Sequence, residues 1–303
     1  MAPVTSTDGE RRIGLAWAAS SALGGALMVV PWKLANQIGD PANSVLLLLL
    51  TAAIGNTLLG LAQRAAGTTR PETARTTAVG VAALLAVFTL LGNHASAVAI
   101  QSLSPALLNV LLRADVLIVA FFGWLLLGER PDGRFWIGAA IAVAGLIVIQ
   151  GSFDANGAVA WLQSGVGLAI AAAACFSGLA VTTRYFIRTI DPTSVNSIRL
   201  WIAVAFWILF NPWPRFSDIP PEQILYSTLA AITGPFLGRL ALMNAARHLE
   251  ARTTTLVTLA TPVATLGIAF VILSDWPENH ELLGGAIMIA GISIPLLRIG
   301  RRR

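Results

Sequence analysis

Charged residues are scarce in this chain of 303 residues, and their scarcity excludes a soluble globular protein. Asp, Glu, Lys and Arg make up 12% of the sequence, whereas a soluble domain carries about a quarter of such residues. Hydrophobic residues make up 56% of the chain. We therefore expect the lipid bilayer to be the solvent of this protein.

Cysteine and the usual catalytic motifs are also nearly absent. The single Cys175 lies in an alanine-rich stretch, so we expect no disulfide framework, no metal site and no cofactor. His94, His248 and His280 are scattered, and the sequence contains no His-Glu-x-x-His motif and no phosphate-binding glycine motif. These absences argue against a membrane-embedded enzyme and against transport driven directly by ATP, so we expect a protein that is not an enzyme.

Long apolar runs dominate what is present. A helix needs about 20 residues to cross the hydrocarbon core, and ten segments of roughly this length follow one another with short connections. Trp32, Trp136 and Trp276 lie near segment ends, which is typical of the interfacial aromatic belt. The sequence thus predicts an all-α membrane protein with ten transmembrane helices, at 13–35, 43–62, 76–98, 104–127, 134–151, 164–187, 193–211, 224–247, 253–274 and 282–298.

The cations are distributed asymmetrically between the connections. Short positively charged loops stay in the cytoplasm, so we expect both termini inside, with cytoplasmic tails at 1–12 and 299–303, in the inner (cytoplasmic) membrane. Topology explains the basic excess, so we expect no nucleic-acid partner. The opposite loops carry Lys33 and Arg215. Fifteen cations lie on the predicted cytoplasmic side: Arg11, Arg12, Arg64, Arg70, Arg75, Arg130, Arg134, Arg184, Arg188, Arg247, Arg252, Arg298, Arg301, Arg302 and Arg303.

The second half of the chain repeats the first. A shift of 146 residues aligns Pro131, Gly138, Gly145 and Leu91-Gly92 with Pro277, Gly284, Gly291 and Leu237-Gly238, and a shift of 153 aligns Gly14 and Gly25 with Gly167 and Gly178. The two repeats, 13–151 and 164–298, hold five predicted helices each. Because five is odd, the second repeat enters the membrane from the opposite side, as in secondary transporters that work by alternating access.

One stretch resembles a known family. Leu125-Leu126-Leu127-Gly128-Glu129-Arg130-Pro131, followed by Trp136-Ile137-Gly138 and Gly145, is similar to the fourth and fifth helices of EamA-type members of the drug/metabolite transporter superfamily. The second half departs from the pattern, with Ser274-Asp275-Trp276-Pro277 where the family shows a Gly-Glu pair. The resemblance implies a ten-helix exporter or permease of small metabolites, with a central cavity formed by helices 1–4 and 6–9 and with helices 5 and 10 peripheral.

Charges inside the apolar segments are the first candidates for a site, because a charge in hydrocarbon costs about 2.5–3.5 kcal/mol on insertion scales. Arg113 and Asp115 lie deep in segment 104–127. Arg113 shares a helix face with Asn109 four residues earlier, which predicts a polar stripe along a cavity. Asp115 points elsewhere, about 200° around the helix. It is a candidate counter-ion or coupling residue, or a tie to another helix through Arg239 or an amide.

The eighth segment contains a candidate hinge. Gly234, Pro235 and Gly238 precede Arg239, and a proline inside a helix removes one backbone hydrogen bond and favours a bend. The repeat counterpart of this region is Asn93 with His94, which gives two polar elements at related places. The alternative is that Arg239 extends to the headgroups while the glycines allow close helix packing. For Arg199 we favour this extension to the headgroups.

The cations within the segments outnumber the anion, and this predicts the chemistry of the substrate. The segments contain three cations, Arg113, Arg199 and Arg239, and one anion, Asp115. Arginine binds carboxylate and phosphate groups. We expect a secondary transporter that exports a small metabolite such as an amino acid or another carboxylate-bearing solute. The predicted cavity residues are Asn93, His94, Asn109, Arg113, Arg239 and Trp17, although Trp17 on a lipid-facing surface is an equal alternative.

His94 and Asp115 are candidate proton carriers, which makes the proton a candidate coupling ion. Besides its substrate and the surrounding lipids, we expect the protein to have no partner other than a second copy, as a monomer or a weak homodimer. The main alternative function is a flippase for lipids or lipid headgroups, because headgroup phosphates would also suit Arg113 and Arg239.

Overall fold

The computed structural model describes residues 8–65, 75–127, 133–150, 165–186, 192–211, 216–249, 254, 257–274 and 276–294. Within these ranges the chain is helical and contains no strand. The helices are α1 (Asp8–Ile38), α2 (Pro41–Ala65), α3 (Arg75–Ser102), α4 (Pro105–Leu112), α5 (Asp115–Leu127), α6 (Gly133–Gln150), α8 (Gly165–Phe186), α9 (Pro192–Phe210), α10 (Pro221–Ala231), α11 (Arg239–His248), α13 (Thr261–Leu273) and α14 (Asn279–Ser293). A 3₁₀ turn, Phe216–Asp218, precedes α10, and a π-helix, Ile232–Gly238, joins α10 to α11.

Several of these helices have the length and composition to cross a membrane. Six apolar stretches are long enough: 9–38, 41–63, 79–102, 105–122, 165–183 and 221–242. Three shorter apolar helices are 133–149, 195–210 and 261–273. A multi-pass membrane protein is therefore confirmed. Several sequence-predicted features lie outside the described residues, namely Gly128–Pro131, Asp275, Arg70, Arg188, Arg215, Arg252 and the tails 1–7 and 299–303.

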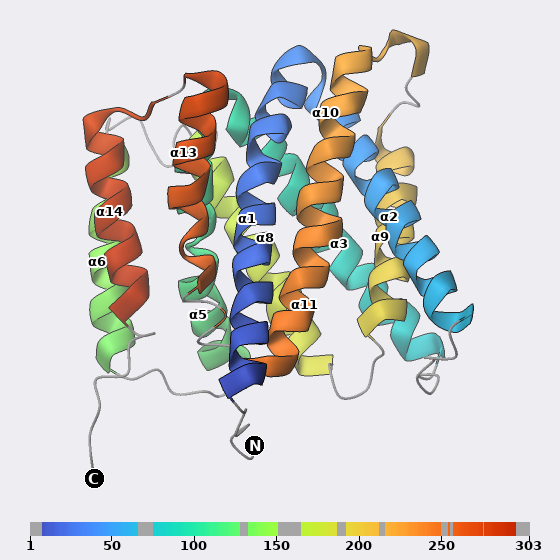
Figure 1. Cartoon of the computed structure of the whole chain (residues 1–303), viewed down its shortest axis with the longest axis horizontal. Helices are drawn as coiled ribbons and strands as arrows, with labels where there is room; N and C mark the ends of the chain where they lie inside the picture. The colour runs from blue at the N-terminus through green and yellow to red at the C-terminus, as the bar shows by residue number, and fades with distance from the viewer. Residues whose placement is uncertain are drawn as a thin grey trace.

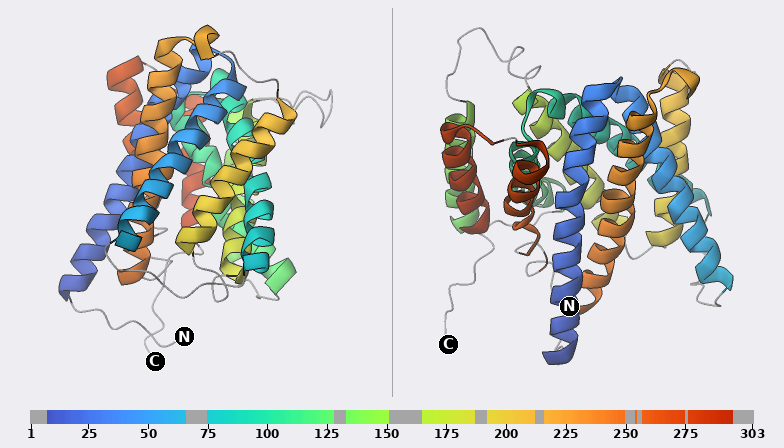
Figure 2. Two further views of the ribbon diagram at one scale, coloured as in Figure 1. Left: turned by 90° about the vertical axis from the view of Figure 1, so that its right-hand side faces the viewer. Right: turned by 45° about the horizontal axis from the view of Figure 1, so that its top comes forward.

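The helices form a bundle with two distinct edges (Figure 1). The pair α6 and α14 forms one edge, α2 and α9 lie at the other, and α1 runs between them. The same pair lies at the margin in the right-hand view of Figure 2. The first residues of α1 and the last residues of α14 lie at the same end of the bundle (Figure 1).

The α6–α14 pair packs through glycines that contact one another reciprocally. A Cβ built on Gly145 would lie 2.6 Å from the carbonyl oxygen of Gly284, and a Cβ on Gly284 would lie 2.6 Å from that of Gly145. A Cβ on Gly291 would likewise stand 2.6 Å from the carbonyl oxygen of Gly138. The 146-residue shift relates Gly138 to Gly284 and Gly145 to Gly291. Exchanging the two halves therefore converts the contact of Gly145 with Gly284 into the contact of Gly291 with Gly138.

The other contacts between the halves also occur in matched pairs. Helix α3 packs on α8 and α9 of the second half, and its repeat counterpart, α10 with α11, packs on α1 and α2 of the first half. Helix α5 packs on α8, and α13 packs on α1. The contact of α2 with α9 is its own counterpart. These helix contacts are thus built twice, once from each half.

The fourth segment is interrupted, which corrects the prediction of one continuous helix over 104–127. A turn at Arg113 and Ala114 separates α4 from α5, and the N–H of Ala114 donates to the carbonyl of Leu111 at 3.0 Å. The ninth segment has its own turn at the related place, where the N–H of Ala260 donates to the carbonyl of Val257 at 3.1 Å.

The residues after the two turns suggest why the helices restart there. Asp115 and Thr261 are the first residues of α5 and α13. Short polar side chains of this kind compete with the helical backbone for hydrogen bonds and favour helix starts. The mean hydropathy of a segment hardly changes with one such residue, so hydropathy alone does not predict the interruption.

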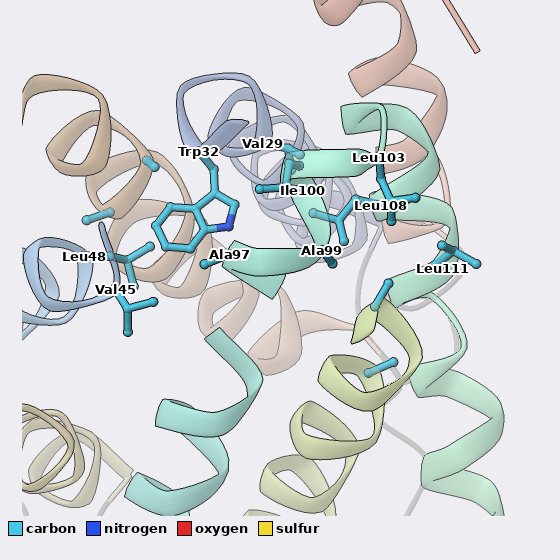
Figure 3. Packing of buried hydrophobic residues seen from close by; sticks show 14 of the residues in the cluster. Val29, Trp32, Val45, Leu48, Ala97, Ala99, Ile100, Leu103, Leu108 and Leu111 are labelled. Carbon is cyan, nitrogen blue, oxygen red and sulfur yellow. The ribbon is translucent and has the colours of Figure 1, made fainter. Parts of the chain in front are cut away.

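The hydrophobic core takes in residues of both halves, and one part of it lies where α1, α2, α3 and α4 meet (Figure 3). The indole of Trp32 points inward between these helices, near Val29 and Ile100. Trp32 is 1% exposed, and its Nε1 donates to Ser96 Oγ at 3.3 Å. The assignment of Trp32 to the interfacial belt is therefore wrong, because a belt residue faces headgroups and water.

Candidate functional site

Arg199 is buried in the middle of α9 and bonded to another helix. Its side chain is 6% exposed. Nη1 donates to Thr89 Oγ1 of α3 at 3.0 Å, and Nη2 donates to Asn196 Oδ1, one turn earlier in α9, at 2.6 Å. Nε is buried without a hydrogen-bond partner. The expectation that Arg199 extends to the headgroups is wrong, because such a guanidinium would be exposed rather than bonded between helices.

Asparagine side chains continue the network into α2. Asn196 Nδ2 donates to Asn56 Oδ1 at 2.9 Å, and Asn56 Nδ2 donates to the carbonyl of Ala52 at 2.8 Å. One residue further along both helices, the hydroxyls of Thr57 and Ser197 lie 3.3 Å apart. Helix α9 of the second half is therefore joined by side-chain hydrogen bonds to both α2 and α3 of the first.

Arg239 is the second cation at this place. It follows the π-helix directly, and its N–H donates to the carbonyl of Gly234, five residues earlier. One turn before Arg239, the ring of Phe236 packs so close to α2 that a Cβ on Gly55 would lie 3.2 Å from it. Gly55 precedes Asn56, which places this turn against the polar network. Arg239 is half-buried, and its charge lies near enough to that of Arg199 to disfavour the Arg199 charge.

We call Asn56, Thr89, Asn196, Arg199 and Arg239 the arginine cluster. In the part of the chain that the structure describes, no carboxylate forms an ion pair with Arg199 or Arg239. Thr89 and Asn196 orient the Arg199 guanidinium, but as neutral groups they do not balance its charge. Uncompensated charge in a low-dielectric interior is costly, and anions form short, strong hydrogen bonds with guanidinium groups. The cluster is therefore chemically suited to an anion.

A second polar group lies at the break between α4 and α5. Oδ1 of Asp115 and Nε of Arg113 are both buried without a hydrogen-bond partner, and the Arg113 charge acts on the Asp115 carboxylate. The backbone oxygen of Asp115 accepts from Ser177 Oγ of α8 at 3.2 Å. A tie from Asp115 to Arg239 is not found among the described residues.

The structure divides the other predicted site residues between different places. Asn109 is 4% exposed and donates to Thr265 Oγ1 at 2.5 Å, which links α4 to α13. Asn93 Nδ2 donates to the carbonyl of Thr89 at 2.7 Å, so Asn93 adjoins the arginine cluster. His94 is exposed on α3, and Trp17 is 41% exposed on α1.

The predicted hinge coincides with irregular backbone. The helix widens into the π-helix Ile232–Gly238, which accommodates the missing N–H of Pro235 without a break. A Cβ on Gly24 of α1 would stand 2.7 Å from the carbonyl of Thr233 and 3.1 Å from Cα of Gly238. The glycines therefore allow close packing against α1, and their role as a hinge stays a prediction.

Sequence reasoning missed most of the arginine cluster. Asn56, Thr89 and Asn196 were not identified, although an asparagine one helical turn before an intramembrane arginine is a detectable signal, since residues three apart share a helix face. Thr89 offers no such signal, because a threonine in a membrane helix commonly bonds its own backbone. Thr89 does so as well, since its Oγ1 donates to the carbonyl of Leu85 at 2.7 Å.

In the described residues the chain is a bundle of apolar helices built from two similar halves, and several of the helices are long enough to cross a membrane, which is typical of a multi-pass membrane protein. The model of the EamA-like transporter family matches residues 12–151 and again residues 163–297. The chain therefore belongs to the EamA-like transporter family, a family of membrane transporters in the drug/metabolite transporter superfamily.

A solved crystal structure of a protein has a similar fold. It superposes with a TM-score of 0.62 at 21% sequence identity, over 94% of this chain and 99% of the other. At this identity the likeness shows the fold alone. No curated protein matches the sequence.

Proposed function

We propose that this protein is a secondary transporter that exports a small anionic metabolite, such as an amino acid or another carboxylate-bearing solute, by alternating access. The observation that carries the proposal is the arginine cluster. Arg199, which is buried, and Arg239, which is half-buried, lie near each other at the contact between the halves, and no described carboxylate pairs with either. An anion would neutralise them at a place where several helices meet.

The proposed architecture is ten transmembrane helices in two inverted repeats, 13–151 and 164–298, around a central cavity. The reciprocal glycine contacts of α6 and α14, the matched helix contacts and the paired turns of the fourth and ninth segments support it. The common end of the first and last helices supports termini on one side (Figure 1). We place that side in the cytoplasm and the protein in the inner membrane, because of the positive charge of the predicted loops.

The hydrogen bonds of the cluster give alternating access a physical basis. The Arg199–Thr89 and Asn196–Asn56 bonds cross between the halves, so relative motion of the halves must break or replace them. An anion bound to the unused N–H groups of Arg199 would draw the guanidinium away from Thr89 and Asn196. Substrate binding would thereby loosen the links between the halves, and release would restore them.

The remaining assignments complete the proposal. Asp115 and His94 are the candidate coupling residues, with the proton as coupling ion. Gly234, Pro235 and Gly238 form the candidate hinge. We propose no cofactor, no catalytic activity, and a monomer or weak homodimer.

Flux through purified protein in phosphatidylcholine liposomes tests this function. The panel contains amino acids, organic acids, phosphorylated metabolites and cationic dyes, each with and without an imposed pH gradient. We expect flux of at least one anionic solute, and Arg199→Gln and Arg239→Gln should each reduce it by about tenfold or more, because each removes a charge-assisted contact worth about 1.5–3 kcal/mol. Arg12→Gln, at an exposed position of α1, is the matched control and should leave flux unchanged.

Three outcomes would contradict the proposal in different ways. Flux of cationic dyes alone would refute the anion preference. Full activity of both arginine variants would remove the cluster from the site. Translocation of a labelled lipid without movement of any solute would favour a flippase instead, because a headgroup phosphate would also suit two arginines.

A further inference from the structure

We infer that the arginine cluster binds a group carrying two negative charges, a phosphate monoester or a dicarboxylate, in preference to a group carrying one. The inference rests on the proposed function and narrows its substrate class. It concerns the charge that the described residues leave unbalanced at Arg199 and Arg239.

The cluster holds two positive charges and no negative one. Arginine stays protonated in proteins, so the two guanidinium groups contribute two positive charges near each other. The hydrogen-bond acceptors of Arg199 are a hydroxyl and an amide oxygen, both neutral. The carboxylate of Asp115 is engaged electrostatically with Arg113 instead. A monoanion would leave one of the two positive charges within the bundle unbalanced, whereas a dianion balances both.

The guanidinium groups of Arg199 and Arg239 have N–H donors that no described residue uses. A guanidinium has five N–H groups, and Arg199 uses one on each Nη for Thr89 and Asn196. Its buried Nε–H remains without a partner, and no hydrogen bond from the Arg239 side chain is found among the described residues. Two cations with unused donors can bind different oxygens of one phosphate, or one carboxylate each of a dicarboxylate.

Arg239 and Arg199 reach the cluster from different helices. The ring of Phe236 packs against Gly55 of α2, beside Asn56, and Arg239 lies one turn further along. Arg239 therefore approaches the cluster from the α10–α11 segment while Arg199 approaches it from α9. A ligand between them would be held from two helices rather than from one.

Pairs of probes that differ by one charge provide the test. The purified full-length protein, in nanodiscs of phosphatidylcholine, is titrated with succinate and its monoamide, and with a phosphate monoester and its methyl diester, at a pH where the first of each pair is dianionic. The readout is the equilibrium dissociation constant. We expect the dianion to bind about tenfold more tightly or better in at least one pair, which corresponds to about 1.4 kcal/mol.

Removal of one cation should abolish the preference. In Arg239→Gln the remaining cation matches one negative charge, so the ratio of dissociation constants should fall to about one, while the monoanion retains measurable binding. Arg12→Gln should keep the wild-type ratio. The ratio is compared only between proteins that elute as a single species and melt cooperatively. Arg239→Lys is a second variant, which conserves the charge and should keep the dianion preference.

The failures are distinguishable. Equal affinity for dianion and monoanion in the wild type would overturn this inference and leave the proposed anion transport intact. Absence of binding and flux for every anion would overturn the proposed function itself. If no solute binds but phosphatidic acid in the nanodisc raises the melting temperature more than phosphatidylglycerol does, the dianion preference stands and its source is a lipid headgroup.

Discussion

Replacing Gly145 with alanine is expected to push α6 away from α14. The added Cβ would stand 2.6 Å from the carbonyl oxygen of Gly284 and 2.6 Å from the N of Met288. Both are backbone atoms, which cannot rotate away as a side chain does, and real Cβ atoms essentially never come within 3.0 Å of another heavy atom. Overpacking of this kind costs about 1–3 kcal/mol. Alanine regains about 1 kcal/mol of helix propensity, so we expect a net loss of up to about 2 kcal/mol.

Unfolding of the purified protein in mixed micelles measures this loss, with Gly267→Ala as the matched control. A Cβ on Gly267 of α13 meets nothing within 4 Å, so the control should be neutral or more stable than wild type. Gly145→Ala combined with Gly284→Ala should cost less than the sum of the two, because the first substitution already separates the helices. Equal stability of Gly145→Ala and Gly267→Ala, or strict additivity of the pair, would refute the reasoning.

Three further predictions concern buried polar groups. Asn196→Ala removes the acceptor of one Arg199 bond and the donor to α2, so thermal melts should show a loss of about 1–3 kcal/mol. Gln223 is 0% exposed and donates through Nε2 to a backbone carbonyl and a serine hydroxyl. Gln223→Glu should therefore destabilise the protein more than Gln223→Ala does. The difference should grow as the pH rises from 5 to 8, because only the protonated acid can donate a hydrogen bond. Arg113→Leu leaves the carboxylate of Asp115 without its cation, so it should be less stable, by about 1 kcal/mol or more, than the double variant in which both residues are leucine; equal melting temperatures would contradict this.

The repeat and the glycine positions could be predicted from the sequence because they depend on spacing. The shift of 146 residues paired Gly138 with Gly284 and Gly145 with Gly291, and these four glycines form the α6–α14 contact. Hydropathy likewise predicted the helices, because the length needed to cross hydrocarbon is fixed by the rise of the helix. Neither signal depends on what a side chain meets in another helix.

The site was predicted less well because its bonds join residues far apart in the chain. Arg239 was identified from its neighbouring Pro235, a local signal. Arg199 was misinterpreted, since its acceptor on Thr89 lies 110 positions away. The turn after Leu112 was missed because it depends on a competition between the helical backbone and one polar residue, Asp115, which hydropathy averages out.

The most direct test of the central claim is an experimental structure of the full-length protein with a transported anion bound. We predict that the anionic oxygens lie about 2.7–3.2 Å from Nε of Arg199 and from the guanidinium of Arg239. An anion bound beside Arg113 and Asp115, with the hydrogen bonds of Arg199 to Thr89 and Asn196 unchanged and Arg239 vacant, would contradict the account.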